Sequence, residues 1–162
     1  MNLVMYENNY YHMKIKKETS AGGIVFKKNQ TPNSKFEVLW LVTQHSQHKG
    51  WVFPKGLIGD ISENEKMEDA ALREVEEEGG VKARIVNPKP VEASYSYVWN
   101  GMHIDKTVYY YLMEYISGDP KNHDWEMIDA KFITEEEVKK ILTYPSDKQA
   151  FDTIIHAFHE KY

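Results

Sequence analysis

Three glutamates have residue types and spacings that could do chemistry: Glu74, Glu77 and Glu78, at positions i, i+3 and i+4. On a helix this spacing brings the three carboxylates together, and their like charges repel one another unless a cation lies among them. Oxygen ligands without cysteine or histidine favour hard cations, so Mg²⁺ is the expected occupant, with Mn²⁺ also possible. Arg73 directly precedes the cluster and could orient one carboxylate.

The loop before these glutamates offers groups that could bind phosphate. It reads WVFPKG over residues 51–56, where Lys55 could meet a phosphate and Gly56 lets the backbone approach a ligand closely. An acidic protein can bind a phosphate chain only through bridging metals and a few placed cations. The loop and the glutamates together therefore indicate metal-dependent phosphate chemistry. Taken alone, the acidic helix is better explained as a solvated face held by salt bridges.

The helix that positions the carboxylates is expected over residues 65–78, ending at the double glycine that follows. Its apolar positions recur at helical spacing and form a stripe for the core: Met67, Ala71 and Val75, with Leu72 on the flank. Glu74 and Glu78 project beside this stripe, whereas Asp69 and Glu76 fall roughly opposite it. The two glutamates beside the stripe are therefore the ones that the core should partly cover.

Composition excludes several classes of protein. The 162 residues are 41% hydrophobic, which suits one folded domain and excludes intrinsic disorder. There is no cysteine, which excludes disulfides, thiolate zinc sites and a cysteine nucleophile. The net charge of −5 argues against a general nucleic-acid binder. No apolar run could span a membrane and the N-terminal residues lack a signal-peptide core, so a cytoplasmic protein is expected.

The remaining elements predict an α/β domain in which helices pack on a mixed sheet. Strands are expected over residues 19–28, 36–43, 81–86, 91–99, 106–115 and 130–133, with Lys55 to Asn64 as a polar loop. Asn100-Gly101 predicts a hairpin turn. Two terminal helices should follow the capping boxes Thr134 to Glu137 and Ser146 to Gln149. Residues 1–18 are interpreted as an N-terminal extension and residues 19–162 as the domain.

Residues 59–81, GDISENEKMEDAALREVEEEGGV, resemble the Nudix box: Gly, five residues, Glu, seven residues, then Arg-Glu-apolar-x-Glu-Glu-x-Gly-apolar. The fixed positions are all filled, by Gly59, Glu65, Arg73, Glu74, Val75, Glu77, Glu78, Gly80 and Val81. The resemblance implies the Nudix fold, a mixed sheet sandwiched between helices (α/β/α). It also implies hydrolysis of a nucleoside diphosphate linked to another group.

The same resemblance implies roles for individual residues. Glu74, Glu77 and Glu78 would bind the metals, Arg73 would orient Glu74, and a metal-activated water would attack one phosphorus. Glu126 would match the acidic ligand or base that the family carries outside the box. Which glutamate is the general base stays open. Glu65 would pair with Arg73 in a structural role.

The loop departs from the usual pattern in one respect. In relatives the glycine of Pro-Lys-Gly is the first glycine of the box, but here Gly56 comes three residues too early and Gly59 satisfies the spacing. The loop is therefore expected to be three residues longer. This leaves open which backbone carbonyl completes the metal shell: that of Lys55, of Gly56 or of a residue near Ile58. Lys55 is taken as the candidate.

Candidate substrate contacts surround this box, each with a simpler alternative. Lys55 is expected to bind phosphate, the alternative being a surface lysine. His45 could reach a phosphate or the base, or be a solvated loop histidine. Tyr97 and Tyr109 could stack on adenine, although at least one of the three consecutive tyrosines from Tyr109 onward should be core. For Trp125, a place in the core and a role in stacking on the base are equally expected.

Within the family the chain resembles the asymmetrically cleaving diadenosine tetraphosphate hydrolases. The features are Pro-Lys-Gly before the box, Lys106-Thr107 in a strand, and Trp125-Glu126 ahead of the last strand. The resemblance implies a small nucleotide substrate and neither a membrane nor a stable nucleic-acid partner. One alternative is another Nudix pyrophosphohydrolase, acting on oxidised nucleoside triphosphates or RNA 5′ ends. The other is a nucleotide-sensing module without catalysis, which the complete box disfavours.

Overall fold

The computed structural model describes residues 14–162, so most of the expected N-terminal extension lies outside the described residues. The elements, in chain order, are β1 (Ile15–Gln30), β2 (Phe36–His45), β3 (Trp51–Val52), β4 (Lys55–Leu57), α1 (Met67–Gly79), β5 (Val81–Ile85), β6 (Val91–Trp99), β7 (Met102–Gly118), a 3₁₀ turn (Pro120–Asn122), β8 (Met127–Thr134), α2 (Glu135–Ile141) and α3 (Pro145–Lys161).

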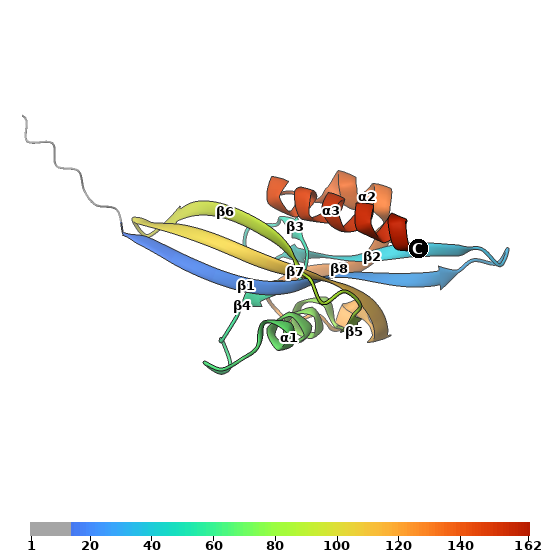
Figure 1. Cartoon of the computed structure of the whole chain (residues 1–162), viewed down its shortest axis with the longest axis horizontal. Coiled ribbons are helices and arrows are strands. Elements are labelled where there is room, and N and C mark those ends of the chain that lie inside the picture. The colour runs from blue at the N-terminus through green and yellow to red at the C-terminus, as the bar shows by residue number, and fades with distance from the viewer. Residues whose placement is uncertain (1–13) are drawn as a thin grey trace, which may run out of the picture.

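All eight strands belong to one mixed sheet. Its main path runs β3-β2-β1-β7-β5, while β4 pairs with β1, β6 with β7 and β8 with β2. The long strands β1 and β7 pair in parallel from Ile15 opposite His103 to Phe26 opposite Glu114, and the other pairings are antiparallel. Figure 1 shows β1, β6 and β7 running side by side as a long arm of the sheet.

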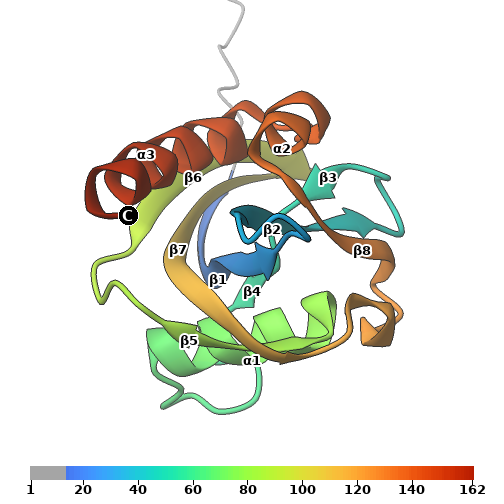
Figure 2. The same cartoon turned by 90° about the vertical axis from the view of Figure 1, so that its right-hand side faces the viewer.

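Helices cover both faces of the sheet, which confirms the predicted α/β/α arrangement (Figure 2). On one face α3 packs over a core that includes Phe26, Trp40 and Phe151. On the other face α1 packs over a smaller core that includes Leu41 and Met113. The two cores follow from the alternation of side chains along each strand, because neighbouring residues point to opposite faces.

Two glycines of β1 let the elements that carry the candidate site lie directly on the sheet. A Cβ atom on Gly22 would come within 2.1 Å of the Pro54 carbonyl oxygen, and one on Gly23 within 2.6 Å of Val75. Gly23 also donates its N–H to the Pro54 carbonyl at 3.1 Å. The loop before β4 and the middle of α1 are therefore both fixed against β1, at a distance that only glycine permits.

The structure confirms some local predictions and corrects others. Thr134 caps α2 by accepting from the Glu137 N–H at 3.3 Å, while the Glu137 side chain accepts from the Thr134 N–H at 2.8 Å, as the first capping box predicts. The second prediction, a capping box from Ser146 to Gln149, is wrong. Helix α3 begins at Pro145 with no side-chain cap, because proline's fixed φ suits the first helical position.

Element boundaries differ where pairing between distant strands decides them. Lys55–Leu57 forms strand β4 rather than a loop, because it pairs with residues 20–22 of β1. Strand β1 already starts at Ile15, where it meets β7. The hairpin between β6 and β7 turns at Asn100 and Gly101, with φ values of 48° and 70°, as predicted. Among residues 14–162, no helix combines the length and apolar character needed to cross a membrane.

Candidate active site

Helix α1 presents its carboxylates at the boundary between core and solvent. Ala71 and Val75 are fully buried, which confirms that the apolar stripe faces the sheet. Glu74 and Glu78 lie beside it and are only 5% exposed, whereas Glu77 is exposed. The helix ends at Gly80, whose left-handed φ of 70° lets its N–H bond the Glu76 carbonyl. The position of Glu74 and Glu78 beside the apolar stripe therefore keeps these two carboxyl groups largely out of water.

Arg73 ties the acidic cluster to the loop that precedes the helix. Its Nε donates to Glu65 Oε1 at 2.7 Å and its Nη2 to Glu65 Oε2 at 3.1 Å, which confirms the predicted structural pair. Its Nη1 donates to Glu74 Oε1 at 2.6 Å and to Glu77 Oε2 at 3.3 Å. These bonds raise the pKa of Arg73 and lower that of Glu65.

The loop between β4 and α1 is tied to the same hydrogen-bond network. The Gly59 N–H donates to Glu65 Oε2 at 2.9 Å, and Gly59 has a left-handed φ of 83°. Arg73 also donates to the Leu57 carbonyl at 3.3 Å. Glu65 and Arg73 therefore connect this loop to the helix that carries the carboxylates, and its extra length relative to the family stays a prediction.

Strand β4 lies directly on the buried carboxylates. The Lys55 N–H donates to Glu78 Oε2 at 3.0 Å. A Cβ atom on Gly56 would come within 2.0 Å of Glu74 Oε1, so no larger residue fits without displacing that carboxylate. The sequence predicted that Gly56 lets the backbone approach a ligand closely. In this structure the group that the Gly56 backbone approaches is the carboxylate of Glu74.

Burial makes Glu74 and Glu78 reluctant to ionise. It raises the pKa of Glu74 to about 7, although the hydrogen bond and the charge of Arg73 act in the opposite direction. It raises the pKa of Glu78 to about 8, although the hydrogen bond from the Lys55 N–H and the charge of the Lys55 ammonium act in the opposite direction. The charge of Glu126 raises both values, so this residue faces the cluster from the start of β8. Burial likewise raises the pKa of Glu126. The predicted acidic neighbour from outside the box therefore lies at the site.

The donor set fits a hard divalent cation. In the part of the chain that the structure describes, no three His, Asp or Glu side chains converge closely enough to enclose a metal ion. The groups at this spot are nonetheless carboxyl groups: Arg73 engages only Oε1 of Glu74, and the Lys55 N–H engages only Oε2 of Glu78. Carboxylate oxygens are the ligands that Mg²⁺ or Mn²⁺ prefers, so the residue types suit such an ion.

Lys55 and Lys106 both act electrostatically on these carboxylates. Lys106 lies on β7 opposite Glu18 of β1 and Tyr95 of β6. Burial lowers the pKa of Lys106, as does the charge of Lys55, while Glu78 and Glu74 raise it. The sequence drew attention to Lys106 only as part of a motif. Its position in register with the buried Ile104 and Val108 could have indicated that it points inward.

The candidate tyrosines divide between the faces of the sheet. Tyr110 is fully buried and donates to the Asp147 carboxylate at 2.7 Å, and Tyr111 is also buried, so the expectation of a core tyrosine is confirmed. Tyr97 is 37% exposed and stacks on Tyr95, with centroids 6.1 Å apart, on the same face of the β6–β7 pair as Lys106. Tyr109 points to the opposite face of β7.

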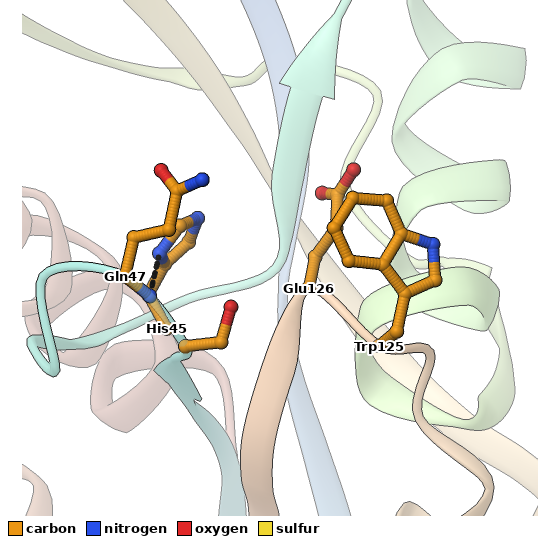
Figure 3. A pocket seen from close by; sticks show the side chains of 5 residues that line it. His45, Gln47, Trp125 and Glu126 are labelled. Carbon is orange, nitrogen blue, oxygen red and sulfur yellow. Dashed lines mark hydrogen bonds between the residues drawn. The ribbon is translucent and has the colours of Figure 1, made fainter.

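A cavity of about 160 Å³ opens beside Glu126, between the end of β2 and the start of β8. His45 and Trp125 line it, together with Ser46, Gln47 and Glu126 (Figure 3). Trp125 is 80% exposed, so it is not a core residue. Burial lowers the pKa of His45, as do the charges of Lys55 and Lys106, which places this histidine in the electrostatic reach of both lysines.

Comparison with known sequences finds one family. Residues 16–154 match the model of the NUDIX domain. The putative mutator protein MutT4 of Mycobacterium tuberculosis (strain CDC 1551 / Oshkosh) is 29% identical over 139 residues. That alignment covers 85% of this chain but 54% of MutT4, so the chain spans about half the length of this relative.

Solved structures share the fold at low identity. A binary complex of a C. elegans Ap4A hydrolase superposes with a TM-score of 0.59 at 21% identity, covering 90% of this chain and 99% of that one. The E. coli ORF135 protein gives 0.56 at 18% identity, covering 91% and 94%. The NUDIX domain of Shewanella oneidensis NrtR, complexed with ADP ribose, gives 0.55 at 16%, covering 98% and 95%. These likenesses show a common architecture.

Proposed function

This chain belongs to the Nudix family, and we propose that it is a Mg²⁺-dependent hydrolase that cleaves diadenosine tetraphosphate into ATP and AMP. The observation that carries the proposal is the cluster of Glu74, Glu78 and Glu126 beside the cations Lys55 and Lys106. Buried carboxylates suit divalent ions, and lysines next to them suit the phosphates that those ions bridge. Mn²⁺ is a chemically acceptable substitute.

Each residue has a distinct part in this proposal. Glu74, Glu77 and Glu78 would hold the cation, with the Lys55 carbonyl as a candidate backbone ligand. When bound, the cation supplies charge neutralisation and lowers the pKa of an attacking water. Arg73 fixes the carboxylate of Glu74 through its 2.6 Å hydrogen bond. Lys55 and Lys106 bind phosphate oxygens, which orients the chain and stabilises charge on the leaving group.

Proton transfer falls to a carboxylate near the reacting phosphorus. Glu126 is the candidate outside the set of carboxylates assigned to the cation, and burial raises its pKa. A general base works best when its pKa is close to the working pH. The proton from the attacking water would rest on a carboxyl oxygen of Glu126 and leave to solvent after the product departs.

The asymmetric outcome follows from having a single site. One set of carboxylates fixes where the reacting phosphorus lies, and a nucleoside anchored at one end determines which phosphorus reaches it. Anchoring one end allows an off-centre cut, and the distance between the anchored nucleoside and the carboxylates selects the bond. Product analysis with diadenosine tetraphosphate tests this directly, with ATP and AMP as the expected products. Two molecules of ADP as the main product would refute the asymmetric cut.

The alternative within the family is a pyrophosphohydrolase for nucleoside triphosphates, including oxidised ones, or for RNA 5′ ends. Its support is the 29% identity with MutT4, which is described as a putative mutator protein. A panel of dinucleoside polyphosphates, nucleoside triphosphates and capped or triphosphorylated RNA separates the two activities by kcat/KM. Turnover that requires Mg²⁺ and stops with chelator excludes the remaining alternative, a domain that only senses nucleotides.

A further inference from the structure

The cavity beside Glu126 has two ring systems at its walls. His45 ends β2 and Trp125 precedes β8, and Figure 3 shows their side chains on opposite sides of the opening, with the carboxylate of Glu126 next to the indole. The two walls are joined by the pairing of β2 with β8, and the Ser46 N–H donates to the Glu126 carbonyl at 2.8 Å. The spacing between the rings is therefore set by the sheet.

The ring of His45 is held in place by its neighbours. The rings of His45 and His48 stack with centroids 4.2 Å apart and an interplanar angle of 7°. His48 Nδ1 in turn accepts from the Gly50 N–H at 3.0 Å and lies 2.9 Å from the Tyr144 hydroxyl. His45 Nδ1 accepts from the Gln47 N–H at 3.1 Å, which leaves Nε2 as the donor of the neutral ring.

The tryptophan wall combines a fixed backbone with an uncovered ring. The Asp124 N–H donates to the carbonyl of Glu77 on α1 at 2.8 Å, and the Glu126 N–H donates to Asp124 Oδ1 at 3.0 Å. The indole between these anchors is 80% exposed, and no aromatic or cationic partner stacks on it among residues 14–162. Covering a large, exposed apolar ring with another flat ring removes apolar surface from water, which stabilises the bound state.

We propose that Trp125 and His45 form the nucleobase subsite, in which the purine of one nucleoside stacks on the indole while His45 Nε2 faces its edge. This inference rests on the proposed function and assigns the end of the substrate that is anchored. A flat neutral ring can contact both the indole and the imidazole that line the opening. Because Glu126 also lines the cavity, a base held there lies beside the catalytic carboxylates.

Tryptophan fluorescence gives a direct test. The probe is a diadenosine tetraphosphate analogue with methylene bridges, which binds without turnover, titrated in Mg²⁺ into the full chain. Trp125→Phe removes the proposed reporter, and Trp99→Phe is the matched control, because Trp99 is similarly exposed at the far tip of the β6–β7 hairpin. We expect quenching in the wild type and in Trp99→Phe, and its loss in Trp125→Phe. Equal quenching in both variants would overturn the subsite.

Affinity gives a second test. Stacking on one base corresponds to about ten- to hundredfold in affinity. Trp125→Ala should raise the Kd of the analogue by that factor, whereas Trp99→Ala should leave it unchanged. The Kd of inorganic tetraphosphate, which has no base, should change much less in Trp125→Ala than the Kd of the analogue. An equal loss of affinity for both compounds would mean that Trp125 does not recognise the base.

The two proposals fail in different ways. If the wild type binds the analogue with quenching of Trp125 but hydrolyses no phosphoanhydride, the subsite stands and the proposed reaction is wrong. If the wild type hydrolyses nucleotides and Trp125→Ala matches Trp99→Ala in KM and kcat, the reaction stands and the subsite is wrong. Because Trp125 lies on the surface, its variants should keep the wild-type circular dichroism and Tm, which removes misfolding as an explanation.

Discussion

Replacing Glu78 with glutamine should separate stability from activity. The side chain is 5% exposed, and its carboxyl has a pKa of about 8 against an ordinary 4.5. An acid whose pKa is raised on folding binds its proton more tightly in the folded state. Its stabilising contribution is therefore complete below pH 4.5 and is lost as the pH rises towards 8. Glutamine keeps the size of the side chain and its acceptor oxygen for the Lys55 N–H but has no charge to bury.

The magnitude follows from the width of that pH window. At pH 7 the unfolded carboxyl is ionised and the folded one is largely protonated, which costs the wild type about 1.4 kcal/mol for each pH unit above 4.5. That gives about 3 kcal/mol as an upper value, and local relaxation reduces it. With chelator present we expect Glu78→Gln to be about 1–3 kcal/mol more stable than the wild type at pH 7, and nearly equal to it at pH 4.5.

Activity should move in the opposite direction. If Glu78 holds the cation, the variant should lose at least ~100-fold in kcat with its fold retained. Added Mg²⁺ should raise the free energy of unfolding of the wild type more than that of the variant, because only an ion that binds the folded state stabilises it. The assays are urea unfolding followed by circular dichroism at pH 4.5, pH 7 and pH 8, with chelator or with Mg²⁺, and steady-state hydrolysis.

The control is Glu76→Gln on the same helix, because that carboxylate is exposed and outside the cluster. It should change neither the pH dependence of stability nor the activity by more than a small amount. Near-normal turnover of Glu78→Gln in Mg²⁺ would refute the assignment of this glutamate to the metal. A variant less stable than the wild type at pH 8 in chelator would refute the argument from burial.

Three further changes test the neighbouring features. Gly56→Ala places a methyl group 2.0 Å from the Glu74 carboxylate, so kcat should fall at least ~10-fold, and unchanged kinetics would show that this contact is easily relieved. Lys55→Ala should raise KM roughly tenfold or more for dinucleoside tetraphosphates and less for nucleoside diphosphates, with equal effects counting against a contact to distal phosphates. Thr134→Ala should lower the free energy of unfolding by about 1 kcal/mol, while Ser146→Ala, which removes no cap, should lower it by less than half as much in the same urea titration.

Local sequence patterns predicted much of the acidic helix. The stripe of Ala71 and Val75 faces the core, Glu74 and Glu78 lie beside it, and Glu65 pairs with Arg73. The burial of the stripe and the placing of the two glutamates depend on helical periodicity, which is set by residues within a few turns of each other. Glu65 precedes α1, so its pairing with Arg73 was expected from the family resemblance instead. The turn at Asn100-Gly101 was predictable from local sequence as well, since a two-residue hairpin turn is specified by its own residues.

Where two local signals competed, the pattern alone misled. Ser146 to Gln149 has the spacing of a capping box, yet Pro145 starts the helix one residue earlier, and the carboxylate of Asp147 accepts from the buried Tyr110 hydroxyl. Lys55–Leu57 looked like loop because it is short and polar, but a partner more than thirty residues away in β1 made it a strand. Pairing with a distant segment leaves no mark in a short strand's own sequence.

The sequence by itself thus determined the family, the carboxylates and the helix that presents them, because a long motif and a periodic helix are both written in consecutive residues. Only the tertiary structure decided which residues from other elements face that helix. The parallel pairing of β7 with β1 places Lys106 opposite Glu18, and the pairing of β8 with β2 brings the exposed Trp125 to the cavity that His45 also lines. Strand register and sheet twist bring such residues together across long stretches of chain, and neither can be deduced from residue types and spacing within a single segment.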